Sequence, residues 1–201
     1  TSNDNVYIES GRTVTANSSG CVASTLHVSA GNSRALLNVT TGGTLVCDSV
    51  SISTSSKRAE IYVYNTGQLT VKKGYRIDHT NGTENNIWAL WVGNTATVNI
   101  AGNIEIINPS SSQGGLLLDG SSITTVSGNI IFNGNANDRA ILGMGGTARL
   151  NIKGNLTITS GKFGKLYNTD GVHTTVINFN GTKAQTLELT PSAANSNLWQ
   201  Y

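Results

Sequence analysis

The sequence predicts an all-β fold, a right-handed parallel β-solenoid of about seven coils with a period near 26 residues. One phrase occurs three times, at 100–106, 126–132 and 152–158, so that its central Gly-Asn pair recurs every 26 residues. A leucine column at Leu90, Leu116 and Leu142 keeps the same step. No helical periodicity exceeds two turns. Strand, corner and strand in units of roughly 20–30 residues are typical of stacked coils about 4.8 Å apart.

Each copy of the phrase places apolar residues on both sides of Gly-Asn, with alternate residues of the second strand on one face. Gly and Asn tolerate positive φ, so the pair predicts a sharp corner between two strands. Stacked coils would bring Asn103, Asn129 and Asn155 into one column. We expect an internal ladder in which each side-chain amide bonds the next, rather than a row of ligand-binding groups.

The remaining elements follow from the same register. Residues 5–15 form two short strands around a Ser-Gly turn, and later coils begin at 35–39, 60–63, 88–92, 116–118 and 140–142. Apolar triplets extend the phrase backwards in steps of 29, 25 and 24 residues; they are Val71, Tyr75 and Ile77, then Val46, Val50 and Ile52, then Val22, Leu26 and Val28. Residues 176–189 form a last, longer coil, and 197–201 resembles the start of another strand. We therefore expect residues 1–201 to be a single solenoid segment of a longer chain.

The two cysteines, Cys21 and Cys47, are separated by one full period of the repeat, which suggests that they stack. In the triplet register, however, Cys21 precedes Val22 whereas Cys47 follows Val46. An offset of two positions on neighbouring strands would separate the Cα atoms by roughly 8 Å, beyond the reach of a disulfide. A gap placed differently in the register would allow the bridge, so both alternatives remain open.

Composition excludes several classes of protein. Charged residues make up 12% of the chain, the net charge is +2, and no apolar run is long enough to span a bilayer. The basic pairs Lys57-Arg58 and Lys72-Lys73 are isolated, whereas a nucleic-acid-binding surface would show a basic stripe. Outward-facing His27 and loop residue His173 lack metal spacing, and no calcium-binding repeat occurs. We expect no nucleic-acid partner, no membrane span, no metal and no cofactor.

Some β-helices are polysaccharide lyases, which need carboxylates, or an acid with Lys or Arg, gathered in one groove. The 11 acidic residues of this chain are scattered. The best local set is Asp78, His79 and Glu84, whose imidazole and carboxylates are suited to acid–base chemistry or to a metal, although a solvated loop explains them as well. The sequence therefore predicts no enzyme, with a lyase-like β-helix as the alternative.

Aromatic side chains gather at coil beginnings, where Trp88, Trp91, Tyr62 and Tyr64 are the candidate ligand contacts, with Tyr167 in a later coil. An exposed aromatic row on a flat sheet would stack against the CH faces of sugar rings. Strand alternation places Trp88 opposite to Trp91, so that only one of them is expected to face outward. Packing between coils or within the core is the other explanation of these residues.

Residues 4–15, the Gly-x-Leu-x-Val stretch at 67–71 and residues 179–187 resemble the repeats of very large cell-surface proteins of Bacteroidota. Such proteins are typically exported by the type IX system and include the filamentous adhesins of gliding bacteria. The resemblance implies a structural and adhesive segment of an extracellular surface filament, with surface or glycan ligands and self-association into fibres. The alternative is a carbohydrate-binding β-helix module of a secreted polysaccharide-degrading protein.

Overall fold

The computed structural model describes residues 4–79, 87–108, 114–134, 140–160, 162–165 and 174–189. Within these ranges the chain forms 19 β-strands and no helix. The strands are β1 (Val6–Ile8), β2 (Thr13–Ala16), β3 (Cys21–Ala30), β4 (Ala35–Val39), β5 (Thr44–Thr54), β6 (Ala59–Val63), β7 (Gln68–Asp78), β8 (Ile87–Val92), β9 (Thr97–Ile100), β10 (Ile104–Asn108), β11 (Gly114–Leu118), β12 (Ile123–Val126), β13 (Ile130–Gly134), β14 (Ala140–Met144), β15 (Arg149–Ile152), β16 (Leu156–Ser160), β17 (Lys162–Lys165), β18 (Val176–Phe179) and β19 (Leu187–Leu189). As no helix occurs in this part, none is available to cross a membrane.

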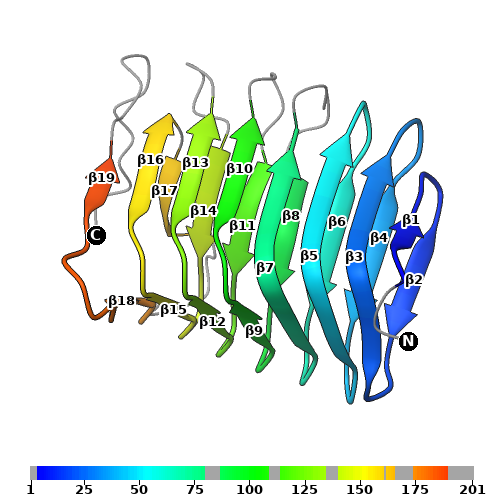
Figure 1. Cartoon of the computed structure of the whole chain (residues 1–201), viewed down its shortest axis with the longest axis horizontal. Helices are drawn as coiled ribbons and strands as arrows, with labels where there is room; N and C mark the ends of the chain where they lie inside the picture. The colour runs from blue at the N-terminus through cyan, green and yellow to red at the C-terminus, as the bar shows by residue number, and fades with distance from the viewer. Residues whose placement is uncertain are drawn as a thin grey trace.

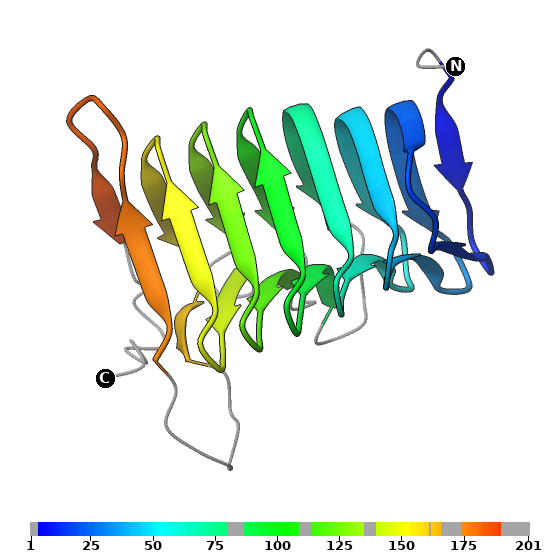
Figure 2. The same ribbon diagram turned by 90° about the horizontal axis from the view of Figure 1, so that it is seen from below.

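The strands form two parallel sheets that wrap around one core (Figure 1). Sheet A has 12 strands, and sheet B has seven, in the order β17-β14-β11-β8-β6-β4-β2. Sheet A itself bends into two faces, because β7 pairs with β9 through Gln68–Val71 and with β10 through Tyr75–Asp78. The coil therefore has three faces, and Figure 2 shows the face formed by β9, β12, β15 and β18.

The coil is right-handed. In Figure 1 the sheet A strands run upward in front and the sheet B strands run downward behind, while the chain advances from right to left. The sequence-derived prediction of a parallel β-solenoid with the period of the Gly-Asn phrase is confirmed, since Leu116 pairs with Leu142 and Ile130 with Leu156. The number of turns is close to the predicted seven, as the seven strands of sheet B show.

Apolar columns fill the interior. Ile104 pairs with Tyr75 on one side and with Ile130 on the other, and all three side chains are buried. Leu90 and Leu116 are also in register, as the leucine column predicts. Because alternate residues of a strand point to opposite faces, each coil stacks its apolar residues on those of its neighbours. Ser, Thr and Asn take many of the outward positions.

The predicted register is wrong at one corner. Val22 does pair with Val46, but Cys47, rather than Val46, lies beside Val71. The cause is a bulge, because β7 has one more residue than β5 between these pairs. Because β3 pairs with β5 without a shift, Ala23 lies beside Cys47 and takes the inward position, while Val22 is on the outside with 45% of its surface exposed.

The cysteines are not bridged. Cys21 pairs with Leu45 and Ala23 pairs with Cys47, which is the offset of two positions expected from the triplet register. Both thiols are free. Burial raises the pKa of the Cys47 thiol to about 12, so this side chain is a neutral part of the core.

The glycines of the Gly-Asn corners are required for a different reason from the one predicted. None of them has a positive φ. Instead the stacked backbones approach so closely that a Cβ at Gly128 would lie 2.5 Å from the carbonyl oxygen of Gly102. A Cβ at Gly102 would overlap the carbonyl oxygen of Lys73. Positive φ occurs at the corner that follows sheet B, in the column Asn65 (58°), Asn94 (56°), Gly120 (65°) and Gly146 (61°).

The asparagine ladder is present, with one change in its bonding. The Oδ1 atom of Asn103 accepts a hydrogen bond of 2.8 Å from the backbone N–H of Asn129, and Asn129 Oδ1 accepts one of 2.8 Å from Asn155. Asn155 in turn accepts from the N–H of Thr186 at 2.9 Å. The side chains thus bind the next backbone rather than the next amide, and they cap N–H groups that the corner removes from the sheet.

Candidate functional site

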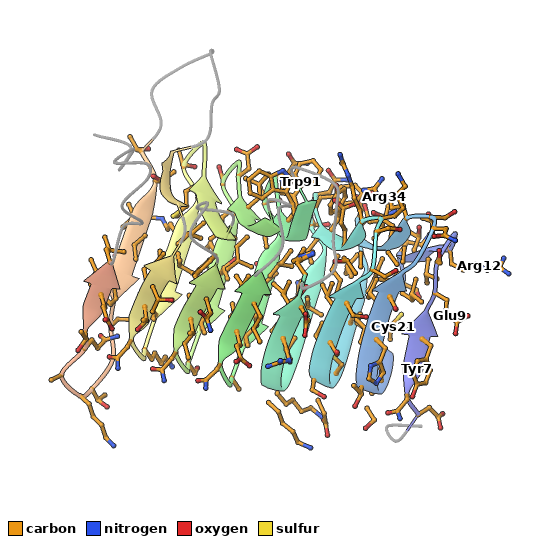
Figure 3. The ribbon with its side chains drawn as sticks, turned by 90° about the horizontal axis from the view of Figure 1, so that it is seen from above. Tyr7, Glu9, Arg12, Cys21, Arg34 and Trp91 are labelled. Carbon is orange, nitrogen blue, oxygen red and sulfur yellow. The ribbon has the colours of Figure 1, made fainter. Side chains whose placement is uncertain are left out.

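Three of the four predicted aromatic residues come together on the outer side of sheet B. Tyr62 pairs with Asn38 on one neighbouring coil and with Trp91 on the other. The residues flanking Trp91 in β8, Leu90 and Val92, are buried in the core. Alternation therefore directs Tyr62 and Trp91 away from the core, as Figure 3 shows for Trp91.

A recess of about 230 Å³ lies beside these rings. It is named the Trp91 recess here, and its lining residues are Asn38, Tyr62, Tyr64, Trp91, Gly93, Asn94 and Asp119. Tyr64, Gly93 and Asp119 occupy equivalent positions on three successive coils, because Gly93 and Asp119 each donate a backbone hydrogen bond to the coil before them. Gly93 has no side chain, and the Trp91 indole packs into the space that a side chain there would take.

An ionic and aromatic network holds the wall of the recess. The rings of Tyr62 and Trp91 meet edge to face, with centroids 4.7 Å apart and an interplanar angle of 84°. The Arg34 guanidinium lies 5.1 Å from the centroid of Tyr62, and Arg34 Nε is 2.5 Å from Glu60 Oε2. The Tyr62 hydroxyl donates to Glu60 Oε1 at 3.3 Å. Tyr62 is thus fixed from three directions, and its ring supports that of Trp91.

Glu60 anchors this network. Its side chain has no exposed surface, whereas 43% of the Arg34 side chain is exposed. Desolvation raises the pKa of the Glu60 carboxyl, and the neighbouring Arg34 cation opposes that increase. Desolvation likewise raises the pKa of the Tyr62 hydroxyl, which therefore remains protonated and keeps donating to Glu60. The position of Glu60 suits a structural role beneath the recess rather than contact with a ligand.

Polar atoms surround the rings. Trp91 Nε1 is buried and has no hydrogen-bond partner among the described residues, and a Cβ at Gly93 would lie 3.3 Å from it. Asp119 Oδ1 accepts a hydrogen bond of 2.7 Å from the N–H of Gly120. Asn94 Nδ2 donates to Asn65 Oδ1 at 2.7 Å, so its own Oδ1 remains available as an acceptor. The recess therefore combines aromatic surfaces with a carboxylate and an amide, while the indole N–H is turned away from solvent.

Trp88 is not part of the recess. It pairs with Gly115, and the register then shifts so that Leu90 pairs with Leu116. Ala89 is the extra residue, and it is buried together with Leu90. Trp88 therefore takes an outward register position like Trp91, and the prediction that only one of them faces outward is wrong because a bulge interrupts the alternation. Tyr167 lies outside the described residues.

The candidate catalytic residues do not form a surface site in the described part of the chain. His79 is completely buried, and its Nδ1 is 3.1 Å from Thr54 Oγ1. Desolvation lowers the pKa of its imidazole to about 4. Glu84 and His173 lie outside the described residues. Within those residues no group of three or more His, Cys, Asp and Glu side chains could hold a metal ion.

Sequence reasoning missed the polar half of the recess. Asp119, Asn94 and Gly93 were not identified, nor were Arg34 and Glu60 beneath Tyr62. The signal was available in the spacing, since Tyr64, Gly93 and Asp119 are separated by the same steps that align the core columns. Applying the register to outward positions as well as inward ones would have placed these residues together.

Comparisons with protein-family models, with curated proteins and with solved structures gave no match for this chain. The resemblance to Bacteroidota surface repeats therefore stays a prediction, and the chemistry of the Trp91 recess is inferred from its own geometry.

Proposed function

We propose that this chain is a structural and adhesive segment of an extracellular bacterial surface protein, and that it binds carbohydrate in the Trp91 recess. The observation that carries the proposal is the meeting of Trp91, Tyr62 and Tyr64 in one recess that also holds Asp119 and Asn94. These residues come from three successive coils and from the corner that follows sheet B, so they form a site only because the solenoid stacks them.

A sugar ring matches both halves of the recess. Its CH face is apolar and packs well on an indole or phenol ring, while its hydroxyl groups need donors and acceptors around the edge. Asp119 and Asn94 supply polar groups at the edge of the recess.

The mechanical part of the proposal rests on the ladders. Parallel pairing is continuous from β2 to β17 in sheet B and from β1 to β18 and β19 in sheet A. Each coil is hydrogen-bonded to both neighbours, and a tension along the axis would be shared by all the ladders at once. A weakly charged exterior rich in Ser, Thr and Asn suits a rod that presents contacts over its length.

The same recess would serve a carbohydrate-binding module of a secreted polysaccharide-degrading protein, which is the second candidate. The two candidates differ in what accompanies this segment in the whole protein. Further repeats on either side of residues 1–201 would favour the surface filament, and a catalytic domain would favour the module.

A glycan array probed with the purified chain tests the binding proposal. The parent should bind at least one polysaccharide, and Trp91→Ala should lower the affinity at least about tenfold, as expected for loss of a stacking platform. Trp88→Ala is the matched control, because it removes a tryptophan from the same strand outside the recess and should bind like the parent. Circular dichroism should show the same fold for all three proteins.

Two results would refute carbohydrate binding in this recess. One is an array on which the folded parent binds no glycan. The other is a Trp91→Ala protein that binds as tightly as the parent while Trp88→Ala does not.

A further inference from the structure

A second ring-binding position lies on the sheet A face of the first coils. Tyr7, His27, Ser51 and Arg76 are partners in register on four successive coils. The residues beside His27, Leu26 and Val28, are buried, so this column faces outward. The sequence predicts that outward orientation for His27, and the structure confirms it.

Two rings of the column are already stacked. The centroids of Tyr7 and His27 are 4.7 Å apart, and the ring planes differ by only 5°. This separation is the spacing between neighbouring strands. A flat group on one coil therefore lies at stacking distance from a flat group on the next, and Tyr7 leaves the second face of His27 uncovered.

The next member of the column carries no ring. Ser51 is too small to reach the open face of His27, and the member after it, Arg76, is turned toward the following coil. Arg76 Nη1 is 2.5 Å from Glu105 Oε2, and Arg76 Nη2 is 3.8 Å from Asp78 Oδ2. His27 and Arg76 are thus two strand spacings apart, about 9.5 Å, with only a serine between them. One flat group fills such an interval.

A trough of about 530 Å³ extends from Ser51 past His27 to the first coil, and its lining includes Tyr7, Glu9, His27, Ser29, Ser51 and Ser53. It is named the His27 trough here. Ser53 Oγ donates to Ser29 Oγ at 3.1 Å, so the Ser29 hydroxyl keeps its own hydrogen to donate, and Ser53 keeps lone pairs to accept. Glu9 adds a carboxylate acceptor at the N-terminal end, where Figure 3 shows it near Tyr7.

We propose that the His27 trough binds one sugar ring, stacked on the free face of His27 above Ser51. A pyranose offers a CH face to the imidazole and hydroxyls to the serines and Glu9. An aromatic side chain of a partner would stack equally well but would leave these hydroxyl groups without partners. A nucleotide phosphate would be repelled by the Glu9 carboxylate. The lining therefore favours a neutral sugar.

This site is independent of the Trp91 recess and goes beyond the proposed function. Trp91 lies on the outer side of sheet B, and Tyr7 lies on the opposite side of the coil (Figure 3). The two sites share no lining residue. One rod would hold glycan on two faces, which allows it to link separate polysaccharide chains or to gain avidity on one.

Nuclear magnetic resonance titration of the full chain with cellohexaose, mannohexaose and chitohexaose tests the proposal. At least one of these neutral sugars should shift the backbone amide signals of His27, Ser29 and Ser51. Ser51→Tyr fills the interval with a ring of the protein itself and should weaken this response at least about tenfold, as should His27→Ala. Ser51→Tyr should fold like the parent, because the new ring extends an existing outward stack.

The control is Thr157→Tyr. Thr157 belongs to the same outward column, where it follows Glu105 and Ile131, and it is remote from the trough. This variant and Trp91→Ala should both keep the parent response at His27, which separates failure of this site from failure of the Trp91 recess. The proposal is wrong if none of the three sugars shifts these signals, if Ser51→Tyr responds like the parent, or if adenosine monophosphate shifts them and the sugars do not.

Discussion

The N-terminal and C-terminal coils turn the same corner of sheet A in different ways. In the N-terminal coils β3, β5 and β7 are continuous strands of 10 or 11 residues that bend through the corner. In the C-terminal coils the corner is a Gly-Asn pair between two short strands, as between β9 and β10. The first corner carries ion pairs from Asp48 to Lys72 and Lys73, and the second carries the asparagine ladder.

The two regions also differ in what they present to solvent. The His27 trough lies on the N-terminal coils, whereas the Trp91 recess spans the boundary between the two regions, because Tyr62 precedes β7 and Asp119 follows β11. The outward column that contains Tyr62 and Trp91 continues in the C-terminal coils as Leu117 and Gly143, which cannot form an aromatic platform. Strict repetition therefore marks close backbone stacking, and departures from it mark the candidate functional surfaces.

The largest expected effect tests what the two regions share, a single stacked core. Ile130 is completely buried and in register with Ile104, whereas its neighbour Ile131 points outward and is half-buried. Ile130→Asp should lower the free energy of unfolding by more than about 4 kcal/mol, because it buries an unpaired carboxylate. Ile131→Asp, the same change on the next residue, should cost less than about 1 kcal/mol. Thermal unfolding followed by circular dichroism measures both, and equal losses would mean that the register is wrong.

A pH titration sharpens the comparison, because buried His79 belongs to the N-terminal type of coil. Desolvation lowers the pKa of its imidazole from 6.5 to about 4, so the folded state binds fewer protons than the unfolded state between these values. The free energy of unfolding should fall by about 3 kcal/mol as the pH drops from about 6.5 to 4. His79→Gln should remove most of this slope in urea unfolding measured at several pH values. A slope unchanged by the substitution would assign it to other groups.

The two corners can be compared directly through their glycines. A Cβ at Gly128 would lie 2.5 Å from the carbonyl oxygen of Gly102, whereas a Cβ at Gly74 would lie 3.6 Å from that of Asn103, an ordinary contact. Gly128→Ala should therefore destabilise the fold by about 2–3 kcal/mol, and Gly74→Ala should change its stability by less than about 1 kcal/mol. Chemical denaturation of the two variants measures the difference. A similar loss for both would contradict the distinction between the corners.

The smallest expected effect concerns the polar groups of the corners. Asn129→Ala removes the acceptor of the Asn155 N–H, and it should cost about 1–2 kcal/mol. Lys72→Ala removes an exposed ion pair with Asp48 and should leave the stability almost unchanged, because solvent screens the pair. Hydrogen exchange of the Asn155 amide gives a local readout, which should accelerate only in Asn129→Ala. An unchanged exchange rate would show that the ladder does not protect this group.

Much of the fold could be predicted from the sequence, because a repeat carries its own register. Because the Gly-Asn pair recurs every 26 residues, Ile104, Ile130 and Leu156, which each follow it, must lie in one core column. The aromatic part of the Trp91 recess was predictable for the same reason, since Tyr62 and Trp91 keep the step of the neighbouring core columns.

Bulges were the part that could not be predicted. β3 and β5 have one residue fewer than β7 at this corner, so a register counted from β7 assigns Val22 to the core in place of Ala23. In β8 the extra residue Ala89 puts Trp88 in an outward position, because one added residue reverses the alternation. No local pattern marks either position. The His27 trough was missed for another reason. This site depends on a serine, Ser51, at the position next to His27 in the outward column. A lone serine in a strand has no sequence pattern that would mark it as part of a binding site.

The constant step between Gly-Asn corners makes the length of this protein adjustable in whole turns. Removing residues 103–128 would join Gly102 to Asn129, which recreates the same dipeptide and leaves each remaining coil beside an equivalent neighbour. Removing half as many residues would instead place core side chains opposite corners. Duplication or loss of complete periods could therefore lengthen or shorten such a rod by about 4.8 Å per turn. The His27 trough, lined by residues of the first three coils, would stay unchanged, whereas loss of 103–128 would remove Asp119 from the Trp91 recess.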